Sequence, residues 1–236
     1  MGSGAGDAIV SGARNTTVGQ GSLSAACAND NTAVGKSALN VFTGSDATAV
    51  GSGALDACTT GAQNVAVGSA ALGAVIDGHY NTAVGTSALA ADCGSSNTAV
   101  GRNSLVSCTG DFNVAVGSVA GDAITSGVQN TCVGHNALGA TDTGHYNVAI
   151  GTSALQADCV DNNVAVGKSA LYSFTASNAT AVGYQAADAA TTATGLTAVG
   201  KDAAGAVTEG DDITAIGQNA LQACVTGAQN TALGSH

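Results

Sequence analysis

The side chains of this chain that could do chemistry are histidines, cysteines and carboxylates. His79, His135 and His145 have no Ser or Cys at a recognisable nucleophile spacing, which argues against a hydrolytic triad. His79 and His145 follow Asp77 and Asp142 in expected turns, but Ca²⁺ needs several converging oxygen ligands, and the Asp-containing turns do not recur densely. We therefore expect no catalytic residue, no metal site and no cofactor.

The seven cysteines could form disulfides, yet their number is odd and no Cys-x-x-Cys pair occurs. Three of them, Cys58, Cys108 and Cys224, fall seven residues after a recurring glycine. At that position other copies of the repeat have Phe42, Phe174, Val75 and Ile124. The shared position predicts that the cysteines are small core residues and mostly unpaired. Cys93 and Cys108 form the one pair on adjacent copies that could bridge.

Two aromatic turns, His79-Tyr80 and His145-Tyr146, are the best candidates for ligand contact. Aromatic and histidine side chains in a turn can stack on sugars or on the surface of a partner protein. The alternative is that each tyrosine only covers the edge of the fold. The sequence leaves both interpretations open.

The composition does not fit a conventional globular core. The chain of 236 residues has 34 Gly, no Trp, no Pro and three Phe, so its side chains are too small unless backbones approach closely. The net charge of −11 repels phosphate backbones and anionic membrane surfaces, which argues against nucleic acid as a partner. No apolar run is long enough to span a membrane, so we expect no membrane insertion.

A short repeat covers almost the whole chain. Its motif glycines are always 16 or 17 residues apart, and they are Gly19, Gly35, Gly51, Gly68, Gly85, Gly101, Gly117, Gly134, Gly151, Gly167, Gly183, Gly200, Gly217 and Gly234. A Val, Ile or Leu comes directly before each of them. Ala stands two before in twelve copies, and Asn stands four before in ten. The glycine permits a bend, and the Asn can bond along a stacked ladder. We interpret the repeat residues as architectural, as in Asn31, Val34, Gly35, Asn81, Val84, Gly85, Asn147, Ile150 and Gly151.

Each repeat is too short for a helical hairpin, and its Thr-Ala-Val run is typical of a strand. A second, weaker strand is expected around the Ala-Leu pair that follows the glycine. Two strands and two turns in about 16 residues make one coil of a parallel β-solenoid, so we predict an all-β fold of about 14 coils. We interpret residues 1–236 as a single repeat domain from a longer fibre, with residues 1–3 and 235–236 added to it.

The strand is apolar on both faces, because residues at alternating positions point to opposite sides of a sheet. We expect the column Val18, Val34, Val50, Val67 and Val84 to fill the dry interior of the coils. The opposite column, Ala33, Ala49, Ala66, Ala83 and Ala99, would then form an exposed stripe. Neighbouring copies of the chain around a symmetry axis could cover that stripe, which predicts a homotrimer.

The string Asn-Thr-Ala-Val-Gly-x-x-Ala resembles the head repeat of trimeric autotransporter adhesins. It is more similar to the Asn-Thr-Ala-Val-Gly-x-x-Ala-Leu repeats of tail-fibre proteins that end in an intramolecular chaperone domain. The autotransporter unit is shorter than the 16 or 17 residues found here, which favours the tail-fibre type. The resemblance implies a left-handed, trimeric β-roll used in fibres and adhesion.

The leading hypothesis is thus a non-enzymatic, extracellular segment of a trimeric fibre, on a virion tail or a bacterial surface. Its partners would be its own copies and a host-surface glycan or protein receptor. One alternative is a monomeric ice-binding solenoid, because Thr stands three before the motif glycine in ten copies, although Val65, Val114, Val148 and Val164 interrupt that column. Another is a fibre-borne polysaccharide depolymerase, for which no consistently spaced carboxylate pair was found.

Overall fold

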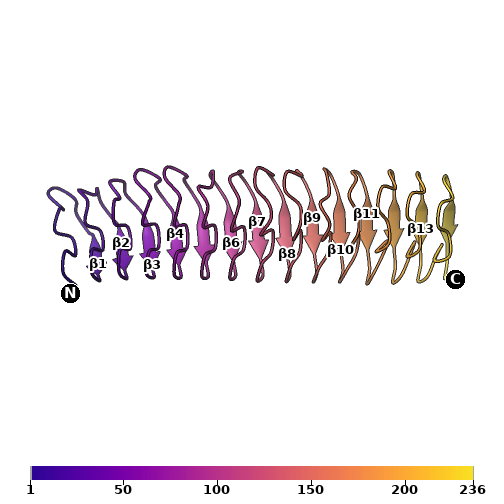
Figure 1. Ribbon diagram of the computed structural model, residues 1–236, viewed down its shortest axis with the longest axis horizontal. Helices are drawn as coiled ribbons and strands as arrows, with labels where there is room; N and C mark the ends of the chain where they lie inside the picture. Colours follow the sequence, from indigo (N-terminus) through magenta and orange to yellow (C-terminus); the bar gives the residue numbers. More distant parts are fainter. Residues whose placement is uncertain (1, 236) are drawn as a thin grey trace. The chain divides into compact units, whose positions relative to one another are not determined.

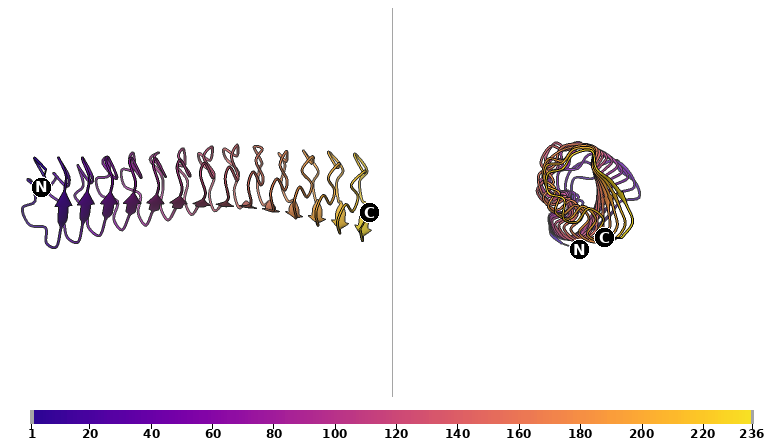
Figure 2. Two further views of the ribbon diagram at one scale, coloured as in Figure 1. Left: turned by 90° about the horizontal axis from the view of Figure 1, so that it is seen from below. Right: turned by 90° about the vertical axis from the view of Figure 1, so that its right-hand side faces the viewer.

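A computed structural model describes residues 2–235. The chain forms two compact units, which meet in the sequence between Ser118 and Val119. Each unit consists of stacked coils of 16 or 17 residues, and each coil carries one three-residue strand. In both figures the strands of a unit lie on one side of its coils and the longer turns on the other (Figures 1 and 2). The predicted all-β parallel solenoid is confirmed.

The strands of the first unit are β1 (Thr16–Val18), β2 (Thr32–Val34), β3 (Thr48–Val50), β4 (Val65–Val67), β5 (Thr82–Val84), β6 (Thr98–Val100) and β7 (Val114–Val116). Each strand pairs in parallel with the next, and equivalent repeat residues are partners. In the pair of β5 and β6, for example, Val84 lies beside Val100. The expected in-register stack of one coil per repeat is therefore confirmed.

The second unit repeats this arrangement with β8 (Thr131–Val133), β9 (Val148–Ile150), β10 (Val164–Val166), β11 (Thr180–Val182), β12 (Thr197–Val199), β13 (Thr214–Ile216) and β14 (Thr231–Leu233). Its consecutive strands are also parallel and in register. The search for a helix that could cross a membrane, made over the described residues, found none.

The core of most coils holds large side chains from the turns and only an Ala methyl group from the strand. Leu four after the motif glycine is fully buried in most coils, as in Leu39 and Leu89. The position seven after the glycine is buried in many coils too, as in Phe42 and Cys58. These residues fill a narrow interior, so the strand can contribute only a small side chain there.

The prediction that Val fills the interior and Ala faces outward is wrong. Ala33, Ala49, Ala66, Ala83 and Ala99 are all fully buried inside the coils. The valines that precede the glycines face outward instead, and the side chains of Val18 and Val84 are 49% and 37% exposed. The two columns are thus exchanged, because the Leu and Phe side chains already occupy the interior volume.

The second strand expected around the Ala-Leu pair is also absent from residues 2–235. The chain turns there instead, and the buried Leu residues have left-handed backbones, with a φ of 51° at Leu39 and 49° at Leu89. The coils nevertheless remain bonded at this corner, since the Leu39 N–H donates to the Ala54 carbonyl at 3.1 Å. A left-handed residue cannot continue a strand, which explains why this corner is a turn.

Two repeat residues account for the close stacking of the coils. The motif glycine has a φ of +138° at Gly85, and a Cβ there would lie 2.5 Å from the Gly101 carbonyl oxygen of the next coil. Asn81 is fully buried, and its Oδ1 accepts from the Asn97 N–H at 2.8 Å while its Nδ2 donates to the Gly94 carbonyl at 2.8 Å. Such side-chain bonds satisfy buried backbone groups between coils.

The other repeat residues named from the sequence have the same roles. Asn31 accepts from the Ala47 N–H at 3.0 Å, and Asn147 accepts from the Asn163 N–H at 2.9 Å. A Cβ at Gly35 or Gly151 would lie 2.3 or 2.6 Å from a glycine carbonyl oxygen of the next coil. Val34 and Ile150 are the last residues of β2 and β9 and face outward like the other residues before a motif glycine.

Candidate functional site

The outward side of the strands is the first surface that could recognise a partner. We call it the Val–Thr face, and it consists of the residues one and three before each motif glycine. Both positions point away from the core, because the buried Ala lies between them in the strand. Val50, Val67, Val84 and Val116 are 37 to 39% exposed in the first unit, and Val182, Val199 and Ile216 are 36 to 38% exposed in the second.

The residue three before the glycine gives the Val–Thr face a mixed chemistry. It is Thr in ten coils and Val in four, and in the first unit Val65 and Val114 are 37% and 36% exposed. The face therefore offers branched apolar side chains and threonine hydroxyls at the regular spacing of the coils, about 4.8 Å. A surface of this kind fits a partner with the same repeat spacing.

The second surface is a turn that precedes each strand. We call the residue five before each motif glycine the turn column, and it has a left-handed backbone in every coil, with φ between 54° and 64° at its non-glycine members. Its members in the first unit are Arg14, Asp30, Asp46, Gln63, Tyr80, Ser96 and Phe112. Because the backbone geometry is the same in each coil, these side chains leave the turn in the same direction.

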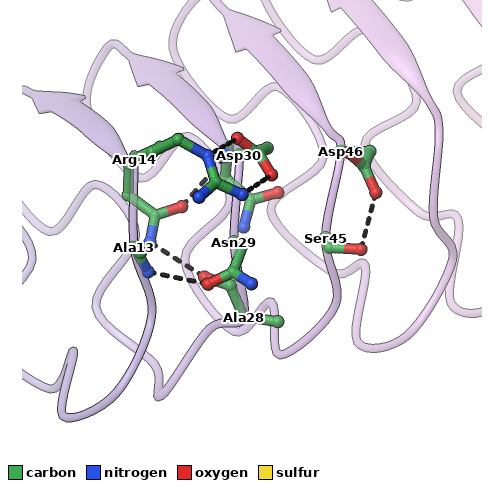
Figure 3. A network of polar contacts seen from close by, with 9 residues as sticks. Ala13, Arg14, Ala28, Asn29, Asp30, Ser45 and Asp46 are labelled. Atoms are coloured by element: carbon green, nitrogen blue, oxygen red, sulfur yellow. Dashed lines mark hydrogen bonds and ion pairs between the residues drawn. The ribbon is translucent and has the colours of Figure 1, made fainter.

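The residue before each member of the turn column ties neighbouring coils together. Figure 3 shows this at the first coils, where the Ala13 N–H donates to Asn29 Oδ1 at 2.8 Å. In the turn column itself, Arg14 donates through Nε and Nη2 to the two carboxylate oxygens of Asp30, both at 2.6 Å. These hydrogen bonds lower the pKa of the Asp30 carboxyl. The turn is thus held by side chains as well as by the backbone.

The two histidines predicted as ligand contacts belong to this internal ladder. His79 Nδ1 accepts from the Ala62 N–H at 3.0 Å, and His145 Nδ1 accepts from the Val128 N–H at 3.1 Å. Both imidazoles are half-buried, so only part of each ring could face a ligand. Their position before the turn column gives them a structural role in the stack.

The tyrosines beside these histidines point into solvent. Tyr80 is 60% exposed and Tyr146 is 52% exposed, and each ring centroid is 6.1 Å from that of its histidine neighbour. They could therefore contact a partner. Phe112 was missed in the sequence although it occupies the same column, five before Gly117, and is 58% exposed. Reading that column across the repeats would have found it.

Six of the seven cysteines are core residues in this structure, which confirms the prediction from the repeat position for Cys58 and Cys108. Cys27, Cys58, Cys93, Cys108, Cys132 and Cys159 are buried, and Cys224 is half-buried. Cys93 and Cys108, the pair that could bridge, are both free thiols. Burial raises the pKa of the Cys93 thiol to about 12 and that of Cys108 to about 11. Thiols with a raised pKa stay protonated at neutral pH and are poor nucleophiles.

No cluster of three or more His, Cys, Asp or Glu side chains that could hold a metal ion was found among residues 2–235. One carboxylate stands out, because Asp122 Oδ1 is buried without a hydrogen-bond partner and burial raises the Asp122 pKa. The electrostatic interaction with His135 lowers the Asp122 pKa, against the effect of burial. Two groups are too few to complete a calcium or zinc site.

Comparisons with known proteins identified no relative of this chain. No family model matches the chain, and neither a curated protein nor a solved structure was found to be similar to it.

Proposed function

We propose that this chain is a structural segment of an elongated fibre that attaches a virion tail or a bacterial cell to a surface. In this proposal the fibre is extracellular and consists of three copies of the chain, joined along their Val–Thr faces. The coils have the left-handed sense that the repeat resemblance implies. The chain has no catalytic role, and its segment of the fibre does not enter a membrane.

The observation that supports this proposal best is the exposed valine column of the Val–Thr face. In a lone chain a contiguous column of apolar side chains would contact water along each unit, which is unusual for a soluble monomer. A second copy of the same chain necessarily has the same coil spacing, so its branched side chains can fit between those of the first in every coil. An unrelated partner protein would not have the same coil spacing unless it were also a solenoid of this kind.

The narrowness of the face favours several copies around an axis. Each strand is three residues long and presents only two outward columns. A narrow stripe is covered efficiently where copies converge on a symmetry axis, with each copy contacting both of its neighbours. The repeat resemblance implies that the number of copies is three.

The direct test is to place charge in this face. We expect the double variant Val50→Asp and Val84→Asp to raise the dissociation constant of the trimer at least about 100-fold, because unpaired carboxylates would be desolvated in the interface. Both side chains already point outward, so the isolated coils should still fold. Light scattering after size exclusion measures the mass, and circular dichroism checks the fold.

A matched control moves the same charges two residues along the chain. Ser52 and Thr86 are exposed and lie just beyond the motif glycines Gly51 and Gly85. The double variant Ser52→Asp and Thr86→Asp should keep the wild-type mass. Equal masses for the two double variants would contradict an interface at the Val–Thr face.

A monomeric ice-binding protein is a second candidate. Nearly all strand Ala residues are buried, so the outward face of the strands carries Thr in ten coils, usually with Val beside it. The two candidates use the same surface and exclude each other. If the fibre proposal holds, the face is covered and the wild-type chain should show no thermal hysteresis of freezing. A monomer whose hysteresis is lost in Thr82→Tyr would favour the ice-binding candidate.

A further inference from the structure

Three successive members of the turn column in the first unit form a surface outside the Val–Thr face. We call Tyr80, Ser96 and Phe112 the aromatic strip. Their φ angles are 61°, 62° and 59°, so the three side chains leave the backbone in the same direction. Tyr80 and Phe112 lie two coils apart, which is about 10 Å along the stack, with the small Ser96 between them.

The aromatic strip is held rigidly by two layers of hydrogen bonds. In the backbone, the Ser96 N–H donates to the His79 carbonyl at 2.9 Å, and the Phe112 N–H donates to the Ser95 carbonyl at 3.2 Å. Beneath the strip, the His79 N–H donates to Ser95 Oγ at 3.1 Å and the Ser95 N–H donates to Asp111 Oδ1 at 2.5 Å. A ligand would therefore meet two rings carried by backbone positions whose spacing is already fixed, which lowers the entropic cost of binding.

Both rings are open to solvent, since Tyr80 is 60% exposed and Phe112 is 58% exposed. Exposed aromatic rings offer an apolar face to a ligand, and the Tyr80 hydroxyl and the Ser96 hydroxyl offer polar partners beside it. A sugar matches this combination, because the C–H face of a pyranose ring can lie on an aromatic ring while its hydroxyl groups bond at the edge.

The surrounding charges restrict the kind of ligand. Between residues 76 and 112, which include the strip, the charged residues are Asp77, Asp92 and Asp111 and one cation, Arg102. The chain as a whole carries a charge of −11. Because acidic groups outnumber basic ones here, such a surface repels sulfated, phosphorylated or uronic-acid polymers. An uncharged ligand avoids this repulsion.

From these features we propose that the aromatic strip binds an uncharged β-1,4-linked glycan on the target surface. Such a chain turns its same face outward at every second sugar, so it can place one sugar on Tyr80 and the next-but-one on Phe112. The sugar between them lies over Ser96, where no ring is needed. This inference rests on the proposed attachment role and names the ligand class for it.

The test uses the full chain and three soluble probes: cellohexaose, β-1,4-mannohexaose and N-acetyl-chitohexaose. Isothermal titration should detect binding of at least one of them to the wild type. Tyr80→Ala and Phe112→Ala should each weaken that binding about tenfold, a loss consistent with one stacked ring. The double variant should show no measurable binding. Because both side chains are exposed, the variants should keep the wild-type thermal midpoint.

Tyr184→Ala is the control, because Tyr184 is 44% exposed but lies outside the turn column, directly after Gly183. It should bind the probe as the wild type does. The inference is overturned if none of the three probes binds, or if the double variant binds as well as the wild type. Measuring the mass of each sample distinguishes a failure of the glycan site from a failure of the trimer. A trimer that binds no probe removes only the glycan site, and a monomer that binds through the strip removes only the trimer.

Discussion

Replacing Gly101 with alanine is expected to destabilise the first unit by about 4 kcal/mol or more, a loss at the upper end for single substitutions. Gly101 has a φ of +134°, and an added Cβ would lie 2.3 Å from the Gly117 carbonyl oxygen and 2.6 Å from its carbon. These are backbone atoms of the next coil, so neither can move aside alone. The coils would have to separate locally, and the ladder bonds on both sides would lengthen. Chemical denaturation followed by circular dichroism measures the loss.

Gly53→Ala is the matched control for this substitution. Gly53 also has a positive φ, +66°, but the nearest atom to an added Cβ is Asp56 Oδ2 at 3.6 Å. Ala70 already occupies the equivalent position of the next coil with a φ of 54°. The control should cost only about 1 to 2 kcal/mol, the usual penalty of a left-handed residue. Equal losses for the two variants would contradict the close contact between coils at the motif glycines.

The second large effect is expected at alkaline pH. Burial raises the thiol pKa to about 11 for Cys58, Cys108 and Cys159 and to about 12 for Cys93, from 9.0 in the unfolded chain. Between these values the unfolded chain releases protons that the folded chain keeps, so stability falls as pH rises. The full contribution is present below pH 9 and is lost by about pH 12. A tenfold difference in proton affinity corresponds to about 1.4 kcal/mol, so the loss should be about 3 to 4 kcal/mol for each thiol.

Urea unfolding at pH 8 and pH 11 measures this loss. The variant Cys58→Val with Cys108→Val should lose distinctly less stability between the two pH values than the wild type. Valine is acceptable at this position of the repeat, since Val75 and Val207 occupy it fully buried in other coils. An identical loss in the variant and the wild type would show that other groups cause the alkaline sensitivity.

The fold could be predicted from the sequence because its determinants recur in every repeat. The glycine spacing set the coil length, and the β-branched run before each glycine located the strand. Both predictions were confirmed. The Asn ladder was also predicted, and Asn81, four before Gly85, does bond to Asn97, four before Gly101, in the next coil.

The orientation of the strand was predicted wrongly, although the sequence contained a signal for it. Thr82 and Val84 point to the same side of β5, and a polar Thr in most repeats indicates that this side faces water. The apolar character of Val favours the interior, but the Thr hydroxyl on the same side of the strand favours water. The Leu residues with left-handed backbones could not have been predicted, because a large side chain is rarely found in that conformation.

The candidate site was only partly visible in the sequence. Tyr80 and Tyr146 were identified and are exposed, but His79 and His145 proved to be ladder residues. The distinction depends on which ring nitrogen meets a neighbouring N–H, which requires coordinates. Phe112 was overlooked because its sequence neighbours differ from those of Tyr80, and only its distance from Gly117 places it in the same column.

If the Val–Thr face joins three copies of the chain, the wild type should have the mass of a trimer in solution. Light scattering coupled to size exclusion should give three times the chain mass of 22.2 kDa, unchanged on dilution into the low micromolar range. A stable species at 22.2 kDa would contradict the trimer and the proposed fibre with it.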